Sequence, residues 1–178
     1  MTGFTFTTAY VGPFAVSLGT GRAGDHQKFR YKIPPKKELI AQGTFVLEGD
    51  IQASWSSGFS KDQVFKPGAN FNSDRAFEKQ VLILNEDLTL TALTDCSYIC
   101  TSAVGIEQKV QLDRHHLKPG DELVVPRYEL AVIAGIDSSV SINGSPQKIG
   151  PRMVYARSRE LVITTQSNAI VGILSFTG

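Results

Sequence analysis

The sequence is short of the residues that disulfide frameworks, metal sites and membrane spans require. Its 178 residues include only two cysteines and three histidines. No apolar run approaches the roughly 18 residues that cross a membrane, so we expect no membrane partner. The 18 basic and 17 acidic side chains nearly cancel, so the weak overall field gives no reason to expect a nucleic-acid partner. The N-terminus has no Lys or Arg before Arg22, so it lacks the charged start of a secretory signal.

The two cysteines, Cys96 and Cys100, are four residues apart. On a straight strand this spacing corresponds to about 13 Å, whereas a disulfide needs Cα atoms within about 7 Å. No histidine follows within the next dozen residues to complete a metal site. We therefore expect two buried thiols in a reducing compartment.

What the sequence does contain is β-structure. Short runs rich in Thr, Val, Ile and Phe are broken by Gly, Pro, Asn and Ser about every ten residues, and no clean helical period appears. This pattern predicts an all-β protein, a sandwich or a barrel. We expect strands at Phe4–Thr7, Lys28–Ile33, Leu39–Leu47, Ile51–Trp55, Asp87–Leu93, Glu122–Val125, Leu130–Ala134, Ser139–Ile142, Leu161–Thr165 and Ala169–Phe176.

Internal similarity indicates two fused copies of one β unit. Residues 88–96 align with residues 161–169 without a gap, and each block is preceded by a Glu-Leu start that runs to a glycine. We therefore expect an extended N-terminal arm at 1–27, a first unit at 28–110 with an inserted loop at 56–80, and a second unit at 111–178. Chance similarity between β segments is the alternative.

The stretch from Leu117 to Gly144 resembles the cupin family. Leu117–Pro126 contains a Lys-Pro-Gly-Asp turn between apolar segments, then come Glu129 and Gly135, and then the short hairpin sequence Val140–Gly144. The resemblance covers about Lys28 to Phe176 and implies a jelly-roll β-barrel.

Active cupins typically bind a metal through a His-x-His pair, a nearby Glu and a distant His. Counting back from Gly135 places Glu122 and Val124 at the histidine positions and Tyr128 at the carboxylate position. Counting back from Gly43 places the cations Arg30, Lys32 and Lys36 there. Neither set suits a divalent metal. We therefore expect neither a metal nor another cofactor.

The remaining histidines allow one kind of chemistry. His115 and His116 are adjacent, so on a strand they face opposite sides and cannot chelate one metal together. Either one alone is a candidate base, as in metal-free sugar isomerases or epimerases of this fold, with Asp113 or Asp121 as the orienting carboxylate. This reading requires one histidine to face the barrel interior beside a carboxylate; the alternative is a histidine without a special role.

Several surfaces suit contacts with other proteins. Lys28, Arg30 and Lys32 lie on one face of a strand, and the arm is too apolar to remain in water. We expect an interface at Phe4, Phe6, Tyr10, Phe14, Lys28, Arg30, Lys32, Lys36, Lys37, Arg157 and Arg159. The partners expected are other protein subunits, in a homo-oligomer or a virion, with a glycan as an alternative. A solvated edge strand guarded by lysines is the competing explanation of the basic residues.

A fold without catalytic groups favours a non-enzymatic assembly protein. By analogy of fold, we expect a bacteriophage virion component, either a capsid decoration protein or a tail-associated protein, located in the virion or in the cytoplasm of the producing cell. The alternatives are the metal-free isomerase or epimerase and a carbohydrate-binding module. The module would use Trp55, Phe59, Phe65 or Phe71 as stacking platforms.

Overall fold

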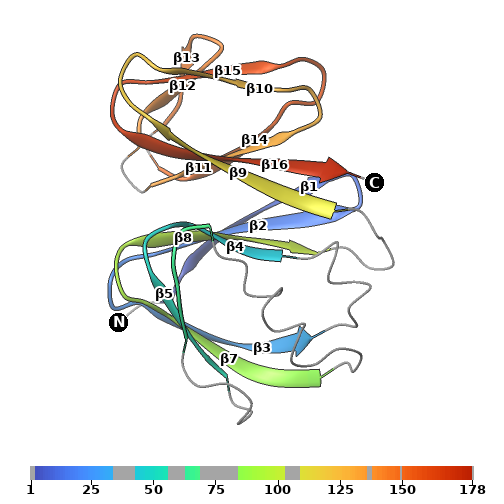
Figure 1. Cartoon of the computed structure of the whole chain (residues 1–178), viewed down its shortest axis with the longest axis vertical. Coiled ribbons are helices and arrows are strands. Elements are labelled where there is room, and N and C mark those ends of the chain that lie inside the picture. Colours follow the sequence, from blue (N-terminus) through green and yellow to red (C-terminus); the bar gives the residue numbers. More distant parts are fainter. Residues whose placement is uncertain are drawn as a thin grey trace. The chain divides into compact units, whose positions relative to one another are not determined.

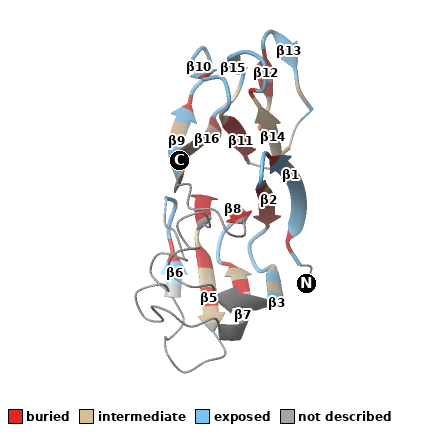
Figure 2. Cartoon of the chain, turned by 90° about the vertical axis from the view of Figure 1, so that its right-hand side faces the viewer, coloured by how far each residue is buried: buried red, intermediate tan, exposed pale blue. Residues whose placement is uncertain are grey.

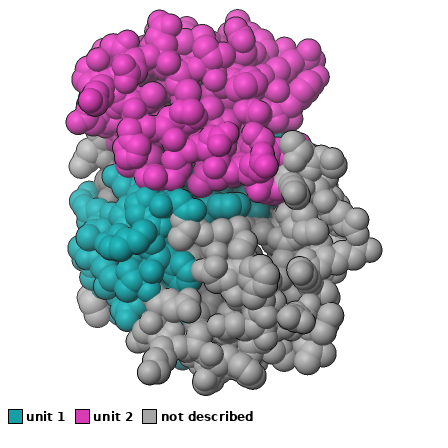
Figure 3. Space-filling view, in the orientation of Figure 1, with its two compact units in different colours: residues 1–108 teal, residues 109–178 magenta. Residues whose placement is uncertain are grey.

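The short apolar runs of the sequence form antiparallel strands in a computed structural model of the chain. The structure describes residues 3–33, 43–55, 63–68, 84–102, 109–135, 138–148 and 150–177, and among these every regular element is a strand. The predicted all-β class is therefore confirmed. The chain divides into two compact units, Met1–Gln108 (unit 1) and Lys109–Gly178 (unit 2) (Figure 3). No helix of the described residues is long and apolar enough to cross a membrane.

Unit 1 contains two four-stranded sheets (Figure 1). The first has the order β1 (Thr5–Val11), β2 (Phe14–Gly21), β8 (Cys96–Ser102), β4 (Gly43–Glu48). The second has the order β3 (His26–Ile33), β7 (Leu84–Ala92), β5 (Ile51–Trp55), β6 (Gln63–Phe65). Both sheets contribute to one apolar core, in which Val46 and Tyr98 from the first sheet meet Ile51 and Leu90 from the second.

Unit 2 repeats this arrangement. One sheet has the order β14 (Arg152–Tyr155), β11 (Leu130–Ala134), β16 (Ala169–Thr177), β9 (Lys109–Leu117). The other has the order β10 (Glu122–Val125), β15 (Leu161–Thr165), β12 (Val140–Ile142), β13 (Ser145–Pro146). The order β10–β15–β12–β13 matches β3–β7–β5–β6 of unit 1, and β9–β16–β11 matches β2–β8–β4. Strand β11 is buried along its whole length (Figure 2).

Strands β1 and β2 lie in residues 1–27, the segment expected to be an arm. They form a hairpin in which β1 pairs with β2 and β2 pairs with β8. Strand β2 carries Gly19 and Gly21, which are unfavourable in strands by propensity, and this explains why no strand was expected there. Their place is explained by packing, because Tyr98 lies against Gly19 and Phe4 lies against Gly21.

Candidate functional site

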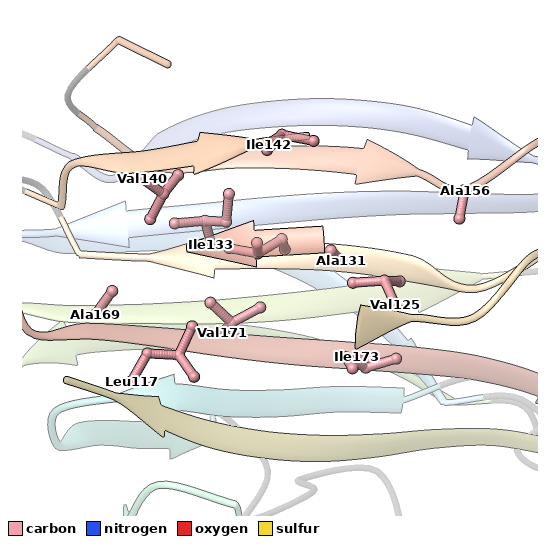
Figure 4. Close-up of a cluster of buried hydrophobic side chains, with 11 residues drawn as sticks. Leu117, Val125, Ala131, Ile133, Val140, Ile142, Ala156, Ala169, Val171 and Ile173 are labelled. Atoms are coloured by element: carbon pink, nitrogen blue, oxygen red, sulfur yellow. The ribbon is translucent and has the colours of Figure 1, made fainter. Parts of the chain in front are cut away.

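The inner face of β9 brings a histidine and a carboxylate to the edge of the apolar interior of unit 2. In the antiparallel register, Leu117 lies opposite Ala169, His115 opposite Val171 and Asp113 opposite Ile173. Ala169, Val171 and Ile173 all belong to the buried cluster between the two sheets, together with Leu117 (Figure 4). Directly opposite residues share a face of a sheet. His115 and Asp113 therefore lie on the inward face.

Exposure rises along this face of β9. Leu117 is buried, His115 is half-buried and Asp113 is exposed. Residues two apart on one strand are separated by about 6.6 Å along the chain, a distance that imidazole and carboxylate side chains can span. The arrangement therefore provides an acid–base group at the rim of the interior, with apolar walls on one side and solvent on the other.

The other histidines and the second candidate carboxylate do not share this position. His116 lies opposite Ile170 on the other face of β9 and is exposed, and His26 is exposed at the start of β3 in unit 1. Asp121 closes the turn between β9 and β10. Its carboxylate accepts a hydrogen bond from the Lys118 backbone N–H (2.8 Å), and its own N–H donates to the Lys118 carbonyl (3.0 Å). Of these candidates, His115 and Asp113 are the histidine and the carboxylate that share the inward face of β9.

A further polar contact near the same face was missed by sequence reasoning. The hydroxyl of Ser175, two residues beyond Ile173 on β16, donates to a carboxylate oxygen of Glu129 at 3.1 Å. Ser175 lies opposite Gln111 of β9, so the polar residues continue along the face that carries Asp113. The sequence does contain a signal for this contact. The alternate residues of the strand are apolar at Ala169, Val171 and Ile173 and become polar at Ser175.

The positions that family spacing assigns to metal ligands in unit 2 do not face the interior. Glu122 and Val124 are exposed, whereas their neighbours Leu123 and Val125 pack with the apolar cluster. Apolar side chains at the inward positions cannot bind a divalent cation. Among the described residues, no three His, Cys, Asp or Glu side chains form a group that could hold a metal ion.

The corresponding positions in unit 1 are described only in part. Backbone pairing places Arg30 opposite Asp87 and Lys32 opposite Asn85, while the side chains of both cations lie outside the described part. Lys36 lies outside the described residues altogether.

The residues expected to form an interface have different environments. Phe4 and Phe14 are buried within the chain itself, whereas Phe6 is 46% and Tyr10 is 76% exposed. Lys28, Arg157 and Arg159 are exposed, and Lys37 lies outside the described residues. Phe4 packs edge-on against Tyr98, with ring centroids 5.6 Å apart, so its burial follows from the core of unit 1.

The aromatic residues proposed as carbohydrate platforms offer little in the described part of the chain. Phe65 is buried in the core of unit 1, so its ring gives no stacking surface. The side chain of Trp55, and Phe59 and Phe71 entirely, lie outside the described residues.

The two thiols lie on the inward side of β8. Cys96 is buried and Cys100 is half-buried, and neither forms a disulfide. Burial raises the pKa of the Cys96 thiol to about 12. A thiol that stays protonated is a poor nucleophile, so Cys96 is structural rather than reactive.

Comparison with known proteins shows the fold. No protein-family model and no curated protein sequence matches the chain. YhhW from Escherichia coli is 12% identical, with 95% of this chain and 93% of that chain covered and a TM-score of 0.53. AerE from Microcystis aeruginosa is 8% identical, with 97% and 92% covered and a TM-score of 0.53. A conserved protein of unknown function from Pseudomonas aeruginosa is 13% identical, with 99% and 89% covered and a TM-score of 0.51.

These comparisons confirm the cupin-like jelly-roll class predicted from the sequence. They contradict the expected role as a bacteriophage virion component. A second structure of YhhW is described as a bacterial pirin in complex with nickel(II), with a TM-score of 0.52 to this chain at 11% identity and coverage of 95% and 94%. The expectation was wrong because it was drawn from the fold by analogy, and one fold carries many unrelated functions.

Proposed function

We propose that the protein isomerises or epimerises a sugar, and that unit 2 contains the metal-independent, cupin-type acid–base site for this reaction. The observation that supports this most directly is the pairing of His115 with Val171, because it turns the imidazole towards the interior beside Asp113. The apolar inward positions Leu123 and Val125 favour a reaction whose proton transfers are made by side chains.

His115 acts as the base in this proposal. Its neutral imidazole removes the proton from the carbon next to the sugar carbonyl, and the electron pair of that bond forms the carbon–carbon double bond of an enediolate. In an isomerisation the imidazolium then returns the proton to the neighbouring carbon, while the hydroxyl proton of the enediolate moves from one oxygen to the other. In an epimerisation the enediolate first turns over in the open rim, so that its opposite face meets the imidazolium and the same carbon takes the proton back. Asp113, two residues along the same face of β9, orients the ring when substrate occupies the rim.

The experiment measures exchange of carbon-bound protons. The protein is incubated in D₂O with D-glucose, D-fructose, D-mannose and their 6-phosphates. Proton NMR then follows the loss of signal from the hydrogens on the carbon next to the carbonyl. We expect exchange in at least one sugar, with a loss of about a hundredfold or more in His115→Gln, since general acid–base groups typically contribute that much.

His116→Gln is the matched control, because the two imidazoles are adjacent in sequence and lie on opposite faces of β9. It should exchange at the unaltered rate. The proposal fails if the unaltered protein exchanges no sugar of the panel, or if His115→Gln and His116→Gln behave alike.

A further inference from the structure

The turn that leads into β11 holds a tyrosine in a backbone conformation that normally requires glycine. Tyr128 has φ 72°, and the Glu129 N–H donates to the Pro126 carbonyl at 3.2 Å. Tyr128 is therefore the third residue of a β-turn in which positive φ favours glycine or asparagine. A bulky side chain at such a position is a genuine outlier, and outliers of this kind concentrate at functional sites.

The same residue is the first of a β-bulge. The N–H of Tyr128 donates to the carbonyl of Ala156 at 2.6 Å, and the N–H of Ala156 donates to the carbonyl of Glu129 at 2.9 Å. Two residues of one segment thus face one residue of the other, and the left-handed first position of such a bulge usually holds glycine. The tyrosine side chain does not compensate by burial, because it is 55% exposed.

The hydrogen bonds of this bulge join two segments, and each segment carries one arginine–tyrosine pair. The guanidinium carbon of Arg127 lies 4.5 Å from the centroid of the Tyr128 ring. Arg157, next to Ala156 in the chain, lies 6.0 Å from the ring centroid of Tyr155. Stacking on a ring restrains the guanidinium, so less entropy is lost when its N–H groups bind a ligand. We call Arg127, Tyr128, Tyr155 and Arg157 the arginine–tyrosine patch.

The patch carries uncompensated positive charge. Arg127 and Arg157 are exposed, and neither forms an ion pair with a carboxylate among the described residues. Two acidic residues lie close to these arginines in the sequence. Glu129 accepts the hydrogen bond from Ser175. Glu160 is exposed and follows Arg157 and Arg159 along the chain. Guanidinium forks bind carboxylates in a bidentate geometry that an ammonium cannot reproduce.

We propose that the arginine–tyrosine patch docks an acidic segment of a partner protein, with carboxylates on the forks of Arg127 and Arg157. Tyrosine and arginine are the residue types most enriched among the energetically important contacts of protein interfaces. A glycan fits less well, because Arg127 already covers one face of the Tyr128 ring and leaves less aromatic surface for a sugar. A nucleic acid fits less well, because the chain has a net charge of only +1.

The probe is a fluorescein-labelled peptide of alternating aspartate and glutamate, and binding is followed by fluorescence anisotropy at low salt. A peptide of alternating asparagine and glutamine tests the requirement for charge. We expect only the acidic peptide to bind. Arg127→Lys and Arg157→Lys keep the charge but lose the fork, and each should weaken binding about tenfold, as expected for a charge-assisted hydrogen-bonded contact.

Two further variants separate docking from folding. Lys148→Ala removes an exposed positive charge of unit 2 outside the patch and should leave binding unchanged. Tyr128→Gly relieves the backbone strain, so it should melt at a higher temperature and yet bind the acidic peptide more weakly. A purely structural tyrosine predicts no loss of binding in this more stable variant.

Three outcomes overturn the proposal. One is that the unaltered protein does not bind the acidic peptide. Another is that Arg127→Lys and Lys148→Ala have the same effect on binding. The third is that heparin binds more tightly than the peptide and depends on the same residues, which assigns the patch to an acidic glycan instead.

Discussion

Tyr98 lies against the backbone of Gly19 on the neighbouring strand, so close that a β-carbon at Gly19 would come within 2.7 Å of the tyrosine ring. The matching pair in unit 2 is Val171 of β16 with His115 of β9. Each unit thus pairs one large residue with one small residue at this place. The large residue is on β8 in unit 1, whereas in unit 2 it is on β9, the equivalent of β2. This exchange keeps one large residue at the place in both units. In unit 2 it puts an imidazole where unit 1 has glycine.

Gly19→Ala should lower the free energy of unfolding by about 1–3 kcal/mol, because the added methyl group overpacks a fully buried site. Tyr98 is 1% exposed and is held edge-on by Phe4 and Phe6, so its ring cannot move away without disturbing both contacts. Urea denaturation measures the loss. In a Tyr98→Val background, which copies the pair of unit 2, the alanine should cost much less; an equal cost in both backgrounds would mean that the ring is not the obstacle.

Tyr98→Phe should leave the protein as stable as before or stabilise it by about 1 kcal/mol. The Tyr98 hydroxyl is buried and has no hydrogen-bond partner among the described residues. Removing an unpaired buried polar atom recovers its desolvation cost while the ring stays in place. Thermal and urea unfolding of the two proteins provide the comparison. A clear loss of stability would show that the hydroxyl has a partner in solution.

The protein should lose stability in alkali through Cys96. Burial raises the pKa of this thiol from 9.0 in the unfolded chain to about 12 in the folded one. The resulting contribution is complete below pH 9 and is lost as the pH rises towards 12, because the unfolded chain then gives up the proton more readily. The free energy of unfolding should fall by up to about 1.4 kcal/mol per pH unit from this group.

Cys96→Ala provides the control for that slope. Because burial also raises the pKa of the Tyr98 hydroxyl, some alkaline dependence should remain in the variant. The difference in stability between the two proteins should be constant below pH 9 and should shrink above it. Parallel pH profiles throughout would contradict the assignment to Cys96.

The strands and the repeat could be predicted because they depend on local patterns. The ungapped alignment of residues 88–96 with residues 161–169 corresponds to β7 leading into β8 and β15 leading into β16, which occupy equivalent places in the two units. Leu90 and Ile163, matched by that alignment, are both fully buried. Propensity and alternation contain this information, since a strand that buries one face repeats its apolar residues with period two.

The orientation of the site residues could not be predicted in the same way. Counting by family spacing assigned ligand positions to Glu122 and Val124, whereas Leu123 and Val125 are the residues that face the interior. A shift of one residue moves every side chain of a strand to the opposite face. If the spacing is uncertain by one position, the sequence therefore cannot tell which residues face the interior. The inward orientation of His115 depends on pairing with β16, more than fifty residues away, and Tyr128 occupies a position where turn chemistry predicts glycine.

The hairpin between β12 and β13 shows how a local signal can be tested. Asn143 and Gly144 both have positive φ, 50° and 80°, as a two-residue hairpin turn of the Asn-Gly type requires. The Asn143 side-chain oxygen also accepts a hydrogen bond from the Val162 N–H at 2.9 Å, which connects the turn to β15. Gly144→Ala should cost about 1 kcal/mol from backbone conformation alone, because no other atom lies within 4 Å of an added β-carbon.

Asn143→Gly should cost a similar amount for a different reason. The backbone conformation becomes easier and the backbone hydrogen bond from residue 143 to the Val162 carbonyl remains, but the bond from the Val162 N–H to the side-chain oxygen is lost. A net contribution of about 1 kcal/mol is typical of such a bond. Asn143→Asp keeps an acceptor at the same place and should retain most of the stability. If Asn143→Gly and Asn143→Asp unfold at the same urea concentration as the unaltered protein, the side chain of Asn143 does not stabilise the link between the turn and β15.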